Sequence, residues 1–439
     1  MGKLSTEYRR PLRLTRCSGA FNYGSNAVAR FLPSNLSSFA RSIGKPVVLV
    51  QINYRVGPFG FAVSKDFATE ADLDDKRECL GNFGFIDQRN ALQWVQDHIH
   101  EFGGDPENVT AAGNSAGSTS IHYHILSGTR FFDRAIMMSG TAGCLGPMSF
   151  ELHEKEWLKA ATLCGISQLP PAIRFHTMRS LSPELLIQVY TAKAMGPYGD
   201  GKLLPLSWTY GDHTAPSRCK SIVLGDTRNE GIIFDIFTKL VPQYGFLAFL
   251  MEVLPDAKIR EGFCSTFGFT TSDYTLGTLP EEVYRDALRL FFTVSAFQYP
   301  TLRVAETFSS SGDPARQAYL YHFDDYSPFE GITFGHSYHG QCGLYLYQNQ
   351  KGTKEFSDSA AAIGENMAQA WLGFAYGLEP WIAYQPEQGE DKFMRFGPEG
   401  ESSLKSMAED NVRDYGLLPW VREHWIDVQR FARRLLLES

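Results

Sequence analysis

Long apolar runs and internal repeats are both missing from this chain of 439 residues. No run approaches the roughly 20 residues that a membrane-spanning helix needs, so we expect no transmembrane segment. Basic residues are also in the minority, 41 against 49 acidic ones, and the net charge of −8 argues against a nucleic-acid partner. With 43% hydrophobic and 21% charged residues, the composition is that of a globular protein with a sizeable core.

The cysteines exclude a further group of functions. The chain has seven of them, an odd number at long spacings, and no C-x-x-C pair, so the usual zinc and thiol-redox motifs are absent. The count allows one or two disulfides but assigns no pairing. The first 16 residues are rich in arginine and have no apolar stretch, unlike a secretory signal peptide, and the localisation stays open.

Strand and helix signals alternate along the chain, which is typical of a mostly parallel sheet with helical crossovers. Apolar runs predict strands at residues 46–54, 109–112, 134–139, 221–226 and 317–324. Periodic segments predict helices at 82–102, 118–126, 281–308, 358–376 and 420–437. No Pro/Gly/Ser linker divides the chain, so we predict one α/β domain with a large helical insertion at about 230–310.

The sequence at 113–117, Gly-Asn-Ser-Ala-Gly, has the G-x-S-x-G pattern of a nucleophile elbow. Such an elbow holds its serine, here Ser115, at a strained turn between a strand and a helix. Small residues on both sides let the two elements approach closely. A turn sequence (GGDP), a short apolar strand and a helix without breakers surround this pattern in the required order. We therefore predict that Ser115 is a nucleophile and that the amide of Ala116 points at a substrate carbonyl oxygen.

Further blocks extend this pattern to most of the chain. They are QINYRVG at 51–57, GNFGFIDQ at 81–88, ALQWV at 91–95, FGGDP at 102–106, GNSAGS at 113–118, SG at 139–140, NEG at 229–231, HG at 339–340, and AW and FA at 370–371 and 374–375. In this order they resemble the type-B carboxylesterase and cholinesterase-like branch of the α/β-hydrolases, and several look like fungal members. The resemblance covers residues from about 19 to the end. It implies an α/β-hydrolase fold with a mostly parallel central sheet flanked by helices. It also implies an enzyme that cleaves a small-molecule ester without metal or cofactor.

The resemblance assigns the remaining catalytic roles. In these hydrolases the chain order is serine, acid, histidine. Glu230 matches the acid position in the loop after the strand at 221–226, and His339 precedes a glycine as the family's base does. Two competitors stay open, because Asp226 lies at the end of the same strand and His336 is close to His339 in sequence.

An oxyanion hole needs backbone amides in addition to that of Ala116. Residues 19–25 (GAFNYGS) resemble the family's glycine-rich oxyanion loop. By this resemblance Gly19 and Ala20 donate to the oxyanion together with Ala116.

Two acidic positions of many family members are neutral in this chain. The residue before the nucleophile is Asn114, where many members have glutamate, and the third residue after His339 is Cys342, where they have an acid. Two buried carboxylates near each other would need a shared proton or a positive charge. Because both are replaced together, we predict a less negative pocket that favours neutral esters.

The segment before the oxyanion loop departs from the family. Residues 10–18 (RPLRLTRCS) contain three arginines and a proline, which do not suit a buried central strand. We therefore predict that residues 1–17 are foreign to the fold, that the hydrolase domain spans 18–439, and that its N-terminal sheet edge is incomplete. A truncated gene product of low stability is one interpretation, and a short variant with a rearranged sheet edge is the other.

The substrate and the precise outcome of the chemistry stay open. Lipids, drug-like esters and lactones all fit, and acyl transfer to an alcohol uses the same chemistry as hydrolysis. The insertion is rich in aromatic residues, which could line an apolar pocket or form a core. They are Phe234, Phe237, Tyr244, Phe246, Phe249, Phe291 and Phe292. The functional alternatives are a non-catalytic adhesion or binding member of the family, or an inactive truncated product.

Overall fold

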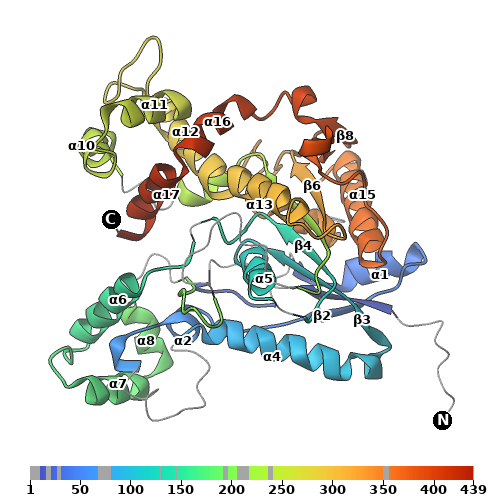
Figure 1. The fold of residues 1–439 in the computed structure, drawn as a ribbon, viewed down its shortest axis with the longest axis horizontal. Coiled ribbons are helices and arrows are strands. Elements are labelled where there is room, and N and C mark those ends of the chain that lie inside the picture. The colour runs from blue at the N-terminus through green and yellow to red at the C-terminus, as the bar shows by residue number, and fades with distance from the viewer. Residues whose placement is uncertain are drawn as a thin grey trace.

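A computed structural model describes residues 10–15, 21–26, 31–67, 81–128, 130–144, 146–190, 196–204, 217–235, 241–349 and 355–438. Within these ranges a single eight-stranded sheet has the order β2-β1-β3-β4-β5-β6-β7-β8. All neighbouring strands are parallel except β8, which runs antiparallel to β7. Helices lie on both sides of this sheet, as in an α/β-hydrolase (Figure 1).

The strands are β1 (Arg10–Thr15), β2 (Val48–Gln51), β3 (Gly104–Asn114), β4 (Arg134–Met138), β5 (Ser221–Thr227), β6 (Gln317–Phe323), β7 (Lys392–Phe396) and β8 (Ser402–Ser406). The longer helices are α1 (Ser34–Ser42), α4 (Phe83–His98), α5 (Ala116–Leu126), α6 (Phe150–Leu163), α7 (Pro171–Ser180), α8 (Pro183–Val189), α10 (Gln243–Val253), α11 (Ala257–Phe267), α12 (Glu281–Phe292), α13 (Tyr299–Ser309), α15 (Asp358–Ala375) and α17 (Trp425–Arg433). Shorter helical pieces are α2 (Gly57–Phe61), η3 (Ile99–Phe102), η4 (Glu230–Phe234), η5 (Thr293–Gln298), α14 (Gln341–Leu346), η6 (Pro386–Gln388), η7 (Met407–Glu409), η8 (Tyr415–Leu417), α16 (Leu418–Glu423) and η9 (Arg434–Glu438). Among the described helices we find no candidate for a membrane-spanning segment.

The central strands are apolar on both faces, because helices cover both. Successive side chains of a strand point to opposite faces, and the two cores divide the residues accordingly. In β4, Ile136 and Met138 pack with α15, whereas Ala135 and Met137 pack with α5. The same division occurs in β5, β6 and the end of β3. Strands β3 to β6 are therefore covered on both faces, and functional groups have to come from the ends of these strands.

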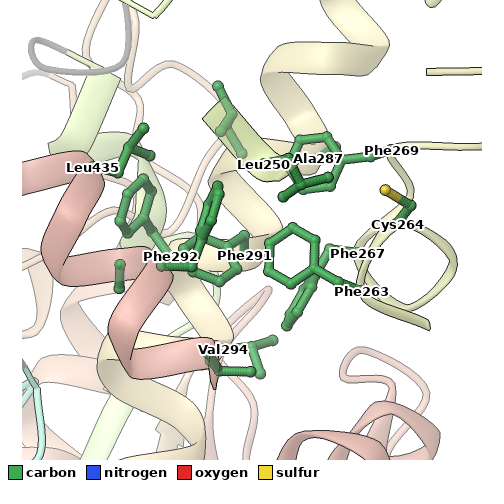
Figure 2. Packing of buried hydrophobic residues seen from close by; sticks show 14 of the residues in the cluster. Leu250, Phe263, Cys264, Phe267, Phe269, Ala287, Phe291, Phe292, Val294 and Leu435 are labelled. Carbon is green, nitrogen blue, oxygen red and sulfur yellow. The ribbon is translucent and has the colours of Figure 1, made fainter. Parts of the chain in front are cut away.

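The helices between β5 and β6, where the insertion was predicted, share a hydrophobic core with the C-terminal helix; it is built from α10, α11, α12, η5 and α17 (Figure 2). Phe246, Phe291 and Phe292 are fully buried in it. Of the aromatic residues that could have lined a pocket, these belong to the core, whereas Tyr244 is 91% exposed on α10. Phe237 lies outside the described residues.

The prediction that Arg10–Thr15 cannot form a central strand is wrong. This segment is β1, and it lies between β2 and β3. Leu12 pairs with Val48, and the ladder with β3 shifts its register between Arg10 and Leu12, at the position of the proline. A bulge of this kind accommodates a residue without an N–H group. Backbone pairing with two neighbours therefore outweighs the unfavourable composition.

Most other predicted elements are present, with different ends. β3 begins at Gly104, five residues before the predicted strand, and the predicted C-terminal helix is divided into α16, α17 and η9. β7 and β8 had no strand signal, because KFMRF and SSLKS lack an apolar run. β8 forms the edge of the sheet, where one side of its backbone needs no partner in the sheet, and β7 lies between β6 and β8.

We expect deletion of residues 1–15 to abolish cooperative thermal unfolding, because β2 and β3 would lose the strand that joins them. The measurement is a melting curve of the purified proteins by circular dichroism. Deletion of residues 1–9 is the matched control, since it keeps β1, and it should melt as the full chain does. Equal melting of all three proteins would show that β1 contributes nothing to stability.

Candidate active site

Ser115 lies at a sharp turn between β3 and α5. Its backbone has φ 54° and ψ −124°, a conformation that is uncommon for a residue with a side chain. A Cβ atom on Gly113 would lie 2.5 Å from the carbonyl carbon of Gly117, so only glycine fits there. A Cβ atom on Gly140 would likewise lie 2.5 Å from the carbonyl oxygen of Ser115. The small residues of the motif therefore allow the strained turn, which supports the sequence-based interpretation of an elbow.

The N-terminus of α5 begins directly after this serine. All eleven residues of the helix are buried, so its N-terminal amides act in surroundings of low polarity. Ala116, the first of them, is 4% exposed. The other two predicted oxyanion donors, Gly19 and Ala20, lie outside the described residues.

His339 and Glu230 form a buried pair. Nδ1 of His339 donates a hydrogen bond to Oε2 of Glu230 at 2.5 Å, and Oε1 of Glu230 accepts from the amide of Thr227 at 2.7 Å. Glu230 is fully buried, and a charged group in such a place needs these donors. With its proton on Nδ1, the imidazole is left with Nε2 as an acceptor. Nε2 has no hydrogen-bond partner among the described residues.

The loop that carries His339 (the histidine loop) lies against the turn that carries Ser115. A Cβ atom on Gly340, the residue after His339, would lie 3.2 Å from the side-chain oxygen of Asn114, the residue before Ser115. No hydrogen bond between Ser115 and His339 is found in the described part of the chain. In unliganded sites such bonds are commonly long and tighten when substrate binds.

Two hydrogen bonds join the loop that carries Glu230 (the acid loop) to the histidine loop. The amide of Asn229 donates to the carbonyl oxygen of Ser337 at 2.8 Å, and the amide of Ser337 donates to Oδ1 of Asn229 at 3.0 Å. Asn229 directly precedes Glu230 in the sequence, and Ser337 lies two positions before His339. Sequence reasoning gave Asn229 no role, although it stands in the NEG block.

Asp226, the competing acid, lies in a different network. It bonds to Nδ1 of His322 at 2.9 Å and to Arg413 at 2.9 Å. Burial acts to raise the pKa of Asp226, but the charges of His322 and Arg413 outweigh it and hold the pKa below its usual value. Arg413 also pairs with Asp324, so the network ties the segment before α16 to the ends of β5 and β6.

His336, the competing base, lies beside residues of the loop that carries Glu230. It lines a cavity of about 300 Å³ together with Asn229, Thr293 and Arg289, and Ser115 is not among the lining residues. Burial and the positive charge of Arg289 lower the pKa of His336. In the described part of the chain, no group of three or more His, Cys, Asp or Glu side chains is arranged to hold a metal ion.

The two positions that are acidic in many family members carry neutral, buried side chains. Asn114 is 2% exposed and donates to the carbonyl oxygen of Met138 at 3.3 Å. Cys342 is fully buried, and its sulfur lies 3.9 Å from the hydroxyl of Tyr321. Burial, assisted by the charge of Glu230, raises the pKa of the Cys342 thiol to about 12. Glu230 therefore has no acidic neighbour at either position.

The sequence model of the carboxylesterase family matches residues 17–415. The chain belongs to this family. Lipase 3 of Yarrowia lipolytica is 26% identical over 353 residues, which are 80% of this chain and 64% of the lipase. Secreted triacylglycerol lipase LIP1 of Gibberella zeae is 27% identical over 418 residues, 89% of this chain and 66% of that protein. The acetylcholinesterase of Electrophorus electricus is 35% identical over 205 residues, 44% of this chain and 31% of that enzyme.

A solved structure of PNB esterase has the same fold, with a TM-score of 0.71 and 22% identity over 97% of this chain and 82% of that one. The stretches of this carboxylesterase-family chain that match the three relatives named above span less than two thirds of the length of each of them.

Replacing Asp226 by asparagine should destabilise the fold by about 3 kcal/mol at neutral pH, because it removes one partner of the buried charge on Arg413. The pKa of Asp226 is lowered by folding, so its stabilising effect is complete above about pH 4 and disappears as the pH falls below that value. Urea unfolding at several pH values measures this difference. Asp427→Asn, at a surface pair with Arg430, is the control and should change stability by less than about 0.5 kcal/mol. Equal effects of the two substitutions would contradict the prediction.

Proposed function

We propose that this protein is a serine hydrolase that cleaves carboxylic esters through Ser115, His339 and Glu230. The observation that carries the proposal is the buried hydrogen bond between His339 and Glu230, which leaves Nε2 of His339 free to act as a base beside the elbow. Family membership supports the reaction type, and the strained backbone of Ser115 supports its role as the nucleophile.

In the proposed mechanism, Ser115 Oγ attacks the ester carbonyl while Nε2 of His339 accepts its proton. Glu230 holds the imidazole in the required tautomer and stabilises the imidazolium. The amide of Ala116, with Gly19 and Ala20 as expected further donors, stabilises the negative oxygen of the tetrahedral intermediate. His339 then protonates the leaving alcohol. Water cleaves the resulting acyl-enzyme by the same steps, and another alcohol in place of water would give acyl transfer.

Esters of apolar acids are the substrate class that we propose. Two of the relatives carry the name lipase, and the neutral residues Asn114 and Cys342 remove two negative charges from the neighbourhood of the catalytic acid. A non-catalytic binding member of the family would have no need for the strained turn at Ser115, which costs on the order of 1–3 kcal/mol.

We expect the wild-type chain to react covalently with a fluorophosphonate probe and to hydrolyse p-nitrophenyl butyrate. Ser115→Ala should do neither, and Glu230→Gln should lower kcat by about 10³ to 10⁴, because the imidazole would lose its orienting charge. Gel fluorescence and a spectrophotometric assay measure the two effects. Ser127→Ala, at a serine after the end of α5, is the control and should keep both. An unlabelled wild type would refute the proposed function.

The neutral surroundings of Glu230 predict a substrate preference. We expect kcat/KM for 3,3-dimethylbutyl acetate to equal or exceed that for acetylcholine, which has the same shape and a positive charge. Without the two carboxylates, the positive charge gains no attraction that offsets its loss of hydration. A pH-stat assay of both esters measures the ratio. A clear preference for acetylcholine would contradict the prediction.

A further inference from the structure

One helix, α12, contacts the turn that carries Glu230 and holds it in place. Gly231, the next residue, lies against the last turn of α12, where an added Cβ atom would come within 2.0 Å of the carbonyl oxygen of Arg289. The side chain of Arg289 bonds to both carboxylate oxygens of Asp235, at 2.6 Å and 3.1 Å, just after η4. Both ends of η4 are therefore held by α12.

A third contact lies closer to the catalytic acid. The amide of Gly231 donates a hydrogen bond of 2.8 Å to Oγ1 of Thr293. Thr293 is 5% exposed, so water does not replace this acceptor easily. It orients the peptide unit between Glu230 and Gly231, and with it the start of the catalytic side chain.

Thr293 is also the first residue of η5, a π-helical turn between α12 and α13. Insertions of this kind are rare in α-helices and are frequent at functional sites. Four residues later in the same turn, the ring of Phe297 lies 4.9 Å from the imidazole of His339, centroid to centroid. One π-helical turn therefore contacts the backbone beside the acid and the side chain of the base.

We propose that Thr293 is a positioning residue, which holds Glu230 in the orientation that its hydrogen bond to His339 requires. The inference rests on the proposed function, because it assigns to Thr293 a role in the same triad. In this assignment the hydroxyl of Thr293 acts on the triad through the peptide unit of Gly231, to which it is hydrogen-bonded. The contribution of the hydroxyl is thus to the rate of the chemical step and not to substrate binding.

The test compares variants of the full chain with p-nitrophenyl butyrate. Thr293→Val keeps the shape of the side chain and removes the acceptor. It should lower kcat about tenfold with KM nearly unchanged, since small displacements of catalytic groups have effects of this size or larger. Thr293→Ser keeps the acceptor and should restore most of the rate. The rate of labelling by a fluorophosphonate should change in the same proportion as kcat.

Thr301→Val is the matched control. Thr301 is buried in α13, and its hydroxyl has no hydrogen-bond partner among the described residues, so its loss should leave kcat unchanged. Melting curves of all variants separate loss of fold from loss of rate. If Thr293→Val does not fold, Thr293→Ser and Thr293→Ala make the same comparison, because they differ only in the hydroxyl group.

Each outcome decides the inference. A lower kcat for the valine or alanine variant, rescued by serine, supports it. An active wild type with equal kcat in the serine and hydroxyl-free variants overturns it and leaves the proposed function intact, and so does a change in KM alone. A wild type without ester turnover or labelling overturns the proposed function, and the inference with it.

Discussion

A buried carboxylate needs hydrogen-bond donors around it, and the proposed site depends on how Glu230 meets this constraint. It is fully buried, and its two oxygens accept from Thr227 and His339. Removing either donor would leave part of a charge without compensation in the protein interior. The loops that carry these donors are in turn held by neighbours. The hydrogen bonds between Asn229 and Ser337 join the acid loop to the histidine loop.

The parallel sheet explains why Ser115, Glu230 and His339 lie at the same edge of the sheet. Parallel strands present their carboxyl ends at one edge, and ligand sites of such sheets form there. Ser115 follows β3, Glu230 follows β5, and His339 lies in the connection after β6. The strands between them are closed to solvent on both faces by two hydrophobic cores. The sheet thus supplies a rigid support, and the chemistry lies in the segments that leave it.

Part of the fold and part of the candidate site could be predicted from the sequence, and the rest depends on contacts between distant residues. The sharp turn at Ser115 could be predicted because it is determined locally, by glycines at fixed spacing. Glu230 and Asp226 could not be separated by chain order, because the choice depends on which of them faces His339 and which faces Arg413. Thr293 and Phe297 gave no signal, since their contacts reach residues far away in the sequence. β1 was misjudged for a related reason, because its backbone partners, β2 and β3, are not visible in its own composition.

Helix α12 connects a hydrophobic core to the loop that carries Glu230. Phe291 and Phe292, at its end, are fully buried in the hydrophobic core of α10 to α12 (Figure 2), and the very next residue, Thr293, accepts a hydrogen bond from the residue after Glu230, the proposed catalytic acid. On the roles proposed for Glu230 and Thr293, changes in the helices between β5 and β6 affect the reaction as well as the packing of that region. Directed evolution that changes the aromatic core to admit new substrates would also shift the position of Glu230. In such libraries turnover and substrate range should change together, even for substitutions that never contact the substrate.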